Sequence, residues 1–147
     1  MYRHILIPTD GSELAQHGVT NGLALAKSLG AKVSAIVVEE PLDWHRFSEM
    51  TAQPPQELQK YLEEPKKQAR SVLDRVAREA KQAGVSCETI QVEGGQPYQA
   101  IIAAAEDKGC DLIVMSSHGR SGLAGVLIGS VTHKVLTHTK IPVLVCR

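Results

Sequence analysis

The sequence has few cysteines, no long apolar run and no excess of charge of either sign. Its three cysteines, Cys87, Cys110 and Cys146, are odd in number and not closely spaced. This argues against a disulfide framework and a zinc knuckle, and it fits a reducing cytoplasm. No apolar run approaches the roughly 20 residues that cross a bilayer, and the N-terminus lacks the apolar stretch of a signal peptide. We therefore expect a cytoplasmic protein without a membrane association.

Acidic residues are also absent from the last quarter of the chain. The sequence has 16 basic and 16 acidic residues, which argues against a general attraction to nucleic acid or anionic lipid. Residues 112–147, however, contain no Asp or Glu, whereas they carry Arg120, Lys134, Lys140 and Arg147. Chance in a short window would explain this asymmetry, and so would a local anion site.

The length and composition indicate one globular domain spanning residues 1–147. The chain has 147 residues, of which 43% are hydrophobic and 22% are charged. A domain of this size buries roughly 70% of the surface that its unfolded chain exposes, so it needs no disulfide or metal to fold.

Short apolar, β-branched runs alternate with longer stretches of helical spacing. We expect strands at 4–8, 32–38, 86–92, 111–115 and 141–146, and helices at 12–29, 56–83, 97–108 and 130–139. Ser12 is the expected N-cap of the first helix, and Gly30 and Gly84 are expected to end the first two helices. We expect residues 39–55 to be irregular and Pro65 to break the second helix or to start a new one.

This alternation predicts the α/β class. Strands separated by helices pair in parallel, and apolar strands without alternation are covered on both faces, so we expect a three-layer α/β/α sandwich with a five-stranded parallel sheet. Ligands of such sheets bind at the carboxyl ends of the strands. Here these ends are residues 8–10, 37–39, 93–95 and 116–119.

A glycine-rich segment, residues 116–130, joins a buried strand to a helix. Its glycines allow backbone amides to approach a ligand closely, and Gly129-Ser130 stands at the helix start, where free amides favour a phosphate. The Ser130 hydroxyl would add a bond to that phosphate or would cap the helix. The same segment would also suit a surface loop with an ordinary cap.

Neither of the common nucleotide-binding glycine motifs follows the first strand. That strand instead ends in Pro8-Thr9-Asp10, where Asp10 would bond ligand hydroxyls or serve as a turn residue. His118 is a candidate phosphate donor or weak acid–base group.

The chain resembles the universal stress protein family over its whole length. Four segments carry the resemblance: 5–12 (ILIPTDGS), 95–97 (GQP), 111–123 (DLIVMSSHGRSGL), and 129–130 (GS) followed by 142–145 (PVLV). The resemblance implies a Rossmann-like sheet of the adenine nucleotide alpha hydrolase type, with strand order 3-2-1-4-5. It also implies a homodimer in which the last strands, Ile141 to Cys146, pair edge to edge.

Members of this family that bind ATP share a Gly-x2-Gly-x9-Gly-Ser/Thr pattern, which falls on Ser116, Gly119, Gly129 and Ser130. The spacing is intact, but Ser116 replaces the first glycine. The resemblance implies that Val37 reads the adenine edge through its backbone, and that a divalent cation, Mg²⁺, bridges phosphate oxygens. The implied nucleotide-binding set is Pro8, Thr9, Asp10, Val37, Met115, Ser116, Ser117, His118, Gly119, Arg120, Gly122, Gly129, Ser130 and Val131.

We therefore expect a dimeric stress-response regulatory module that binds ATP, ADP or AMP. At most it is a slow ATPase, because no base is evidently placed to activate water and Arg120 is the only nearby cation. The alternative is a dimeric interaction protein of the same fold without a nucleotide, which Ser116 favours. A phospho-acceptor receiver would need an acceptor Asp after the third strand, where the sequence reads Val92-Glu93-Gly94-Gly95.

Overall fold

A five-stranded parallel sheet forms the centre of the molecule. The structure is a computed structural model that describes residues 1–120, 122, 125 and 127–147. The strands lie in the order β3-β2-β1-β4-β5, as the resemblance implied. They are β1 (His4–Pro8), β2 (Lys32–Val38), β3 (Cys87–Val92), β4 (Leu112–Ser116) and β5 (Val143–Cys146).

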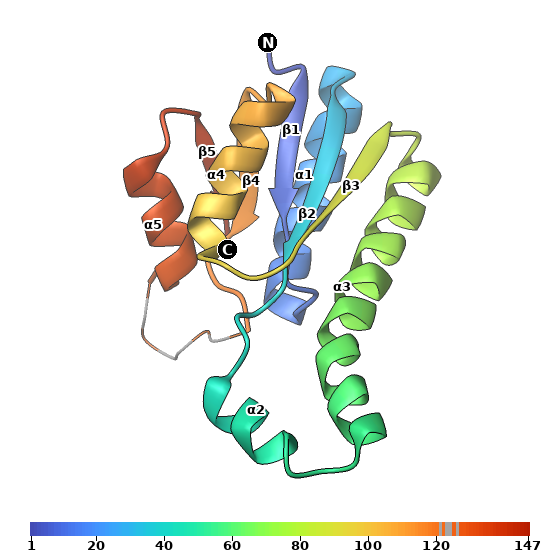
Figure 1. Cartoon of the computed structure of the whole chain (residues 1–147). Coiled ribbons are helices and arrows are strands. Elements are labelled where there is room, and N and C mark those ends of the chain that lie inside the picture. The colour runs from blue at the N-terminus through green and yellow to red at the C-terminus, as the bar shows by residue number, and fades with distance from the viewer. Residues whose placement is uncertain (121, 123–124, 126) are drawn as a thin grey trace.

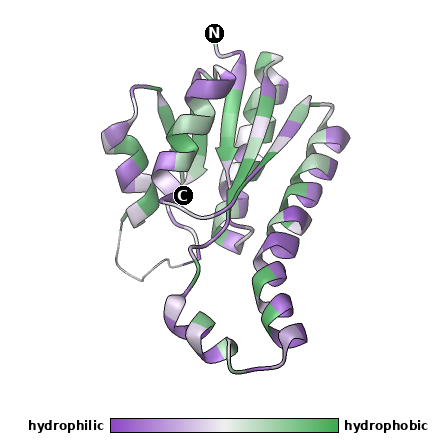
Figure 2. Cartoon of the chain, viewed as in Figure 1, coloured by the Kyte–Doolittle hydropathy of each residue, from purple (hydrophilic) through white to green (hydrophobic). Residues whose placement is uncertain are grey.

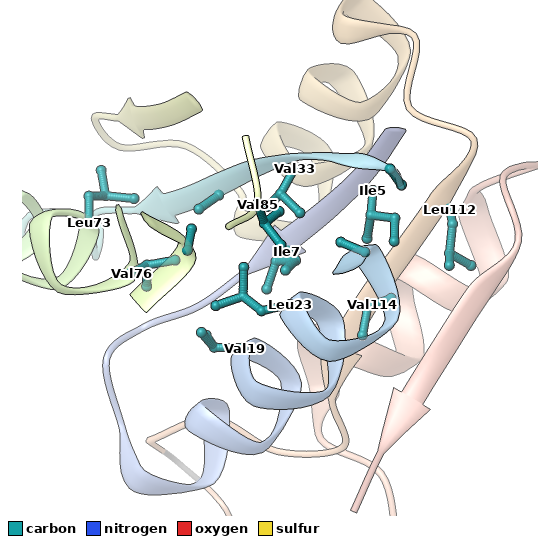
Figure 3. Packing of buried hydrophobic residues seen from close by; sticks show 14 of the residues in the cluster. Ile5, Ile7, Val19, Leu23, Val33, Leu73, Val76, Val85, Leu112 and Val114 are labelled. Carbon is teal, nitrogen blue, oxygen red and sulfur yellow. The ribbon is translucent and has the colours of Figure 1, made fainter. Parts of the chain in front are cut away.

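Helices cover both faces of this sheet, which confirms the three-layer sandwich (Figure 1). The helices are α1 (Glu13–Leu29), α2 (Trp44–Met50), α3 (Pro55–Ala83), α4 (Pro97–Lys108) and α5 (Ser130–His138). Side chains of α1 and α3 pack with Ile5, Ile7 and Val33 on one face (Figure 3), and α4 and α5 pack with Leu6 and Ile36 on the other.

The central strands are buried on both faces, because successive side chains point to opposite sides and helices cover each side. All five residues of β1 are buried, and so are all five of β4. Figure 2 shows the consequence: the strands are largely hydrophobic, whereas hydrophilic residues recur along the outer helices. The unbroken apolar runs in the sequence correspond to this double coverage.

The capping residues that the sequence predicts stand at the starts and ends of the helices. Ser12 caps α1, because its hydroxyl accepts the amide of Ala15 at 3.1 Å. Gly30 ends the same helix with a φ of 64°, a left-handed conformation that side chains with a Cβ resist. Gly84 ends α3 in the same way.

Two expectations for residues 39–83 are wrong. Residues 44–50 form α2 instead of an irregular segment, because the Asp43 carboxylate accepts the amides of His45 and Arg46 at 3.0 and 3.2 Å. In addition, α3 runs through Pro65 without a break. The buried residues of α3 all follow Pro65, so solvent can reach the Tyr61 carbonyl that the proline leaves without a donor.

No helix in the described ranges is long and apolar enough to span a bilayer. Strand boundaries differ slightly from expectation, since β3 begins at Cys87 and β5 at Val143.

A chain of polar side chains crosses the amino end of the sheet. The buried His4 Nε2 lies 2.7 Å from Ser34 Oγ, and the Ser34 hydroxyl donates to Glu88 Oε1, also at 2.7 Å. Lys108 Nζ donates to the second Glu88 oxygen at 2.8 Å. Because the single Ser34 proton is directed at Glu88, Nε2 of His4 must supply the proton of the first bond.

Burial, with a smaller effect of Lys32, lowers the pKa of His4 below its ordinary value of 6.5. The folded protein therefore binds this proton less readily than the unfolded chain does. The pKa of Glu88 is lowered, chiefly by the hydrogen bond from Lys108. The stability that ionised Glu88 contributes is therefore lost only at a more acidic pH.

We expect the free energy of unfolding to decrease as the pH falls below about 6.5, because protonation of His4 favours the unfolded chain. Urea unfolding of the wild type and of His4→Gln between about pH 7.5 and 5.5 measures this. His4→Gln should be less stable overall, yet its stability should depend less on pH in that window. His17→Gln, at an exposed position, is the control. Equal pH dependence of His4→Gln and wild type would contradict the assignment.

Candidate functional site

A cavity of about 190 Å³ opens at the carboxyl edge of the sheet. Its walls come from the ends of β1, β2 and β4 and from the first turns of α4 and α5. Since β1 pairs with β2 on one side and with β4 on the other, the strand order changes direction here. Open α/β sheets bind their ligands at such a switch point.

Most of the residues that the sequence singled out meet at this cavity. Its lining includes Pro8, Thr9, Asp10, Met115, Ser116, His118, Gly119, Gly129, Ser130 and Val131.

The other four residues of the set lie beside the cavity. Val37 and Arg120 line a second, smaller cavity of about 100 Å³. The Val37 side chain belongs to the core under α1 and α3. Ser117 is buried, with its hydroxyl 3.1 Å from His118 Nδ1, and Gly122 donates its amide to the Gly119 carbonyl at 3.2 Å.

Sequence reasoning missed the apolar wall of the cavity. The additional lining residues are the apolar Ala15, Ile36, Val38, Pro97 and Ile101, together with the polar Glu40 and Thr132. The alternation of side chains along residues 32–38 contained a signal, because Ile36 and Val38 must face opposite to Val37. Pro97 was part of the family resemblance but had no predicted contact with the ligand.

The Asp10 carboxylate links the loops that follow β1 and β4. Its Oδ1 accepts the amide of Ser12 at 2.9 Å, and its Oδ2 accepts the amide of Arg120 at 2.7 Å. A Cβ at Gly119 would overlap Oδ2, so the close approach of the two loops requires glycine there. Asp10 therefore holds Gly119 at the edge of the cavity.

The first turn of α5 presents amides without helical acceptors. In the first hydrogen bond of this helix the His133 amide donates to the Gly129 carbonyl at 2.9 Å. The amides of Ser130, Val131 and Thr132 come before it and therefore have no acceptor within the helix. Gly129, rather than Ser130, is the N-cap residue, and it has no side chain to cap these amides. Together with the positive end of the helix dipole, these groups can bind an anion.

Two further bonds fix α5 against the sheet. Gly129 donates its amide to the Ser117 carbonyl at 2.7 Å, and the Thr132 hydroxyl donates to the Ser116 carbonyl at 2.9 Å. A Cβ at Gly129 would lie 3.1 Å from the Ser117 carbonyl oxygen, so a small residue suits this contact. The helix start is thus held directly beside the end of β4.

His118 has a buried ring nitrogen that lacks a partner. Its Nε2 is shielded from solvent and has no hydrogen bond to any residue in the described part of the chain. Buried polar atoms in folded proteins are nearly always hydrogen-bonded, and His118 lines the cavity. Because solvent does not reach Nε2, a ligand in the cavity can bond it only if the imidazole turns.

Ser116, at the position of the first motif glycine, is buried and lines the cavity. Its hydroxyl accepts the His118 amide at 3.4 Å, a long bond. The Ser116 side chain therefore forms part of the cavity wall, and its hydroxyl is already bonded to a backbone amide of the protein.

The cysteines do not contribute a reactive group to this cavity. All three are free thiols, and burial raises their pKa values, that of Cys110 to about 11. Across residues 1–120, 122, 125 and 127–147, no three His, Cys, Asp or Glu side chains are grouped so that they could hold a metal ion.

The fold and site define a three-layer α/β protein with an uncapped helix start at the switch point of its sheet. The chain belongs to the universal stress protein family, whose model matches residues 1–147. It is 35% identical over 147 residues to universal stress protein MJ0531 of Methanocaldococcus jannaschii, covering 100% of this chain and 83% of that protein. It is 32% identical over 149 residues to YxiE of Bacillus subtilis, covering 100% of both.

Solved structures share the fold over the whole chain. The structure of MJ0577 from M. jannaschii matches with a TM-score of 0.81 at 29% identity and covers 99% of this chain and 96% of its own. A universal stress protein in complex with cAMP matches with a TM-score of 0.68 at 24% identity, covering 99% and 97%. One from Archaeoglobus fulgidus in complex with dAMP matches with a TM-score of 0.69 at 16% identity, covering 99% and 98%.

We expect Gly119→Ala to lower the free energy of unfolding by about 1–3 kcal/mol, because its Cβ would displace the Asp10 carboxylate. Gly122→Ala, in the same loop, should cost less because its closest neighbour is the flexible end of Leu14 at 3.0 Å. Chemical denaturation measures both. In an Asp10→Ala background the cost of Gly119→Ala should largely disappear, and strictly additive costs would contradict the contact.

Proposed function

We propose that this chain is a stress-response regulatory module that binds an adenine nucleotide, ATP or else ADP or AMP, in the 190 Å³ cavity. The observation that carries the proposal is that the cavity has a polar wall as well as an apolar wall. One wall carries the first α5 amides, which have no helical acceptors, and the His118 side chain, and apolar side chains form the other. A nucleotide has the same two parts, a charged phosphate group and a flat, largely apolar base.

The lining residues suggest where each part of the nucleotide would lie. The base would pack among Ile36, Val38 and Met115, next to the backbone of Val37. Pro8, Thr9 and Asp10 would border the base and ribose. The phosphates would bind at Gly119, Gly129 and Ser130 with Val131, and Ser116, Ser117, His118, Arg120 and Gly122 would surround them.

Mg²⁺ would accompany the phosphates in this arrangement. Magnesium is usually held by phosphates, water and one or two carboxylates rather than by a cage of protein ligands. Mg²⁺ at this site would therefore be held mainly by phosphate oxygens and water.

The relatives support an adenine nucleotide as the ligand. Two proteins with this fold hold cAMP and dAMP, which have the adenine base and a phosphate in common with ATP. The free helix start and the cationic character of residues 112–147 favour a ligand with several phosphates.

Binding rather than turnover is the activity that the site supports. Efficient phosphoryl transfer needs a group that orients the attacking water and a cation that stabilises the transition state. Both oxygens of Asp10 already accept backbone amides, and the Arg120 guanidinium bonds the Asp10 carbonyl at 2.7 Å. We therefore propose at most a slow ATPase.

We also propose that the protein forms a homodimer through β5 and acts in a reducing cytoplasm. The strand lies at the edge of the sheet, where its unpaired backbone groups favour pairing with a second chain. The Leu144 side chain is 43% exposed on this edge. The three free thiols suit a reducing compartment.

A second candidate is a dimeric interaction protein without a nucleotide. Ser116 favours it, because this side chain stands where the ATP-binding pattern has glycine and lines the cavity. Under this alternative the cavity would be too restricted for the ligand, and the protein would act through its surfaces alone.

We expect titration calorimetry with ATP and Mg²⁺ to detect one site per chain. Ser130→Ala should weaken ATP by about tenfold or more, because one hydrogen bond to a charged group is lost. Thr137→Ala is the matched control, because it removes a hydroxyl from the exposed end of the same helix. No heat with ATP, ADP or AMP would contradict nucleotide binding. Binding that appears only in Ser116→Gly would favour the second candidate.

We expect light scattering to give the mass of a dimer at micromolar concentration. Leu144→Asp should shift the protein to the monomer, because it places a charge at the pairing edge. Leu136→Asp on α5, where Leu136 is 38% exposed, should leave the mass unchanged. A monomeric wild type would contradict the proposed dimer.

A further inference from the structure

Arg120 lies beside the nucleotide cavity and is bonded to the Asp10 loop. Its Nη2 donates to the Asp10 carbonyl at 2.7 Å, and its Nη1 lies 3.7 Å from Glu40 Oε1. Arg120 lines the smaller cavity, whereas its neighbour Gly119 lines the larger one. The guanidinium therefore sits next to the nucleotide cavity without forming part of its wall.

Glu40 stands between the two cavities. It follows β2 by two residues and lines both cavities. The ion pair thus connects the loop after β2 to the loop after β4, with the Asp10 loop between them. The carboxylate of Glu40 also adds negative charge at the entrance of a site proposed to take phosphates.

This ion pair can exchange partners. The side chains of Arg120 and Glu40 are 48% and 77% exposed, and exposed ion pairs contribute little to stability. A polyphosphate offers the guanidinium pairs of oxygens in the geometry that it binds best. Arg120 can leave Glu40 at little cost when such a ligand is present.

We infer that Glu40 competes with the nucleotide phosphates for Arg120, and that this pair makes the affinity depend on the number of phosphates. The inference rests on the proposed function and adds a specificity residue to it. Adenosine and AMP carry too little charge to replace Glu40 as the ion-pair partner of Arg120. ADP and ATP carry enough charge for Arg120 to leave Glu40 and bind their phosphates. Glu40 is a positioning residue in this account, since it acts on the ligand through Arg120.

Affinities of wild type, Glu40→Gln, Arg120→Gln and the double variant for adenosine, AMP, ADP and ATP test the inference. We expect Glu40→Gln to strengthen ATP about two- to fivefold, the range of one exposed charge interaction, and to leave adenosine unchanged. Arg120→Gln should weaken ATP about tenfold or more, as loss of a bond between charged groups does, and should also leave adenosine unchanged. In the Arg120→Gln background the gain from Glu40→Gln should shrink.

Glu93→Gln is the matched control, because Glu93 is an exposed carboxylate that follows β3 and pairs with Lys66 at 3.1 Å. It should leave the ratio of ATP to AMP affinity unchanged. Equal weakening of adenosine, AMP and ATP by Glu40→Gln would overturn the inference, since Glu40 would then bind the ribose. If Glu40→Gln left the ratio of ATP to AMP affinity unchanged, the inference would also be wrong. A wild type that binds none of the four ligands would instead refute the proposed function, and the inference with it.

Discussion

The site depends on the two amides that Asp10 accepts. One comes from Ser12, at the start of α1, and the other from Arg120, in the loop after β4. The second bond joins segments that are 110 residues apart in the sequence. It holds the loop after β4 close to the end of β1, which is possible because Gly119 has no side chain to collide with the carboxylate. The cavity lies beside this contact.

The two ends of the sheet use polar groups in opposite ways. At the amino end, His4, Ser34, Glu88 and Lys108 bond one another in sequence, so their hydrogen-bonding capacity is largely used internally. At the carboxyl end, the first amides of α5 lie at a cavity and have no helical acceptors, and the buried His118 Nε2 has no partner in the described part of the chain. Groups of this kind are costly to bury unless a ligand or water pairs with them. The contrast fits a structural role for the amino end and supports the proposed binding role of the carboxyl end.

Much of the fold could be predicted from the sequence, because its signals are local. Apolar runs mark four of the strands, the alternation of residues 86–92 marks the third along the chain, and Ser12, Gly30 and Gly84 mark helix ends. The strand order is not local, and only the family resemblance supplied it. The α2 helix was missed because it depends on one capping carboxylate, Asp43, and buries no residue of its own. Pro65 suggested a break, yet α3 runs continuously through it, and the buried residues of this helix all follow the proline.

The candidate site was less accessible to sequence reasoning. The glycine-rich segment predicted the wall of the cavity that carries free amides, because amides without acceptors occur wherever a helix starts. To predict the apolar wall, one must know which face of the sheet each β2 side chain points to. Ile36 and Val38 lie at the cavity, whereas Val37 lies in the core on the opposite face. The Arg120–Glu40 pair joins loops that only the tertiary fold brings together.

Nuclear magnetic resonance of ¹⁵N-labelled protein tests the central claim most directly. The account predicts that ATP shifts the amide signals of Ser130 and Val131 and the Nε2 signal of His118, whereas adenosine leaves the two amides nearly unchanged. Shifts confined to other parts of the molecule, or none at millimolar ATP, would contradict a phosphate site at the start of α5.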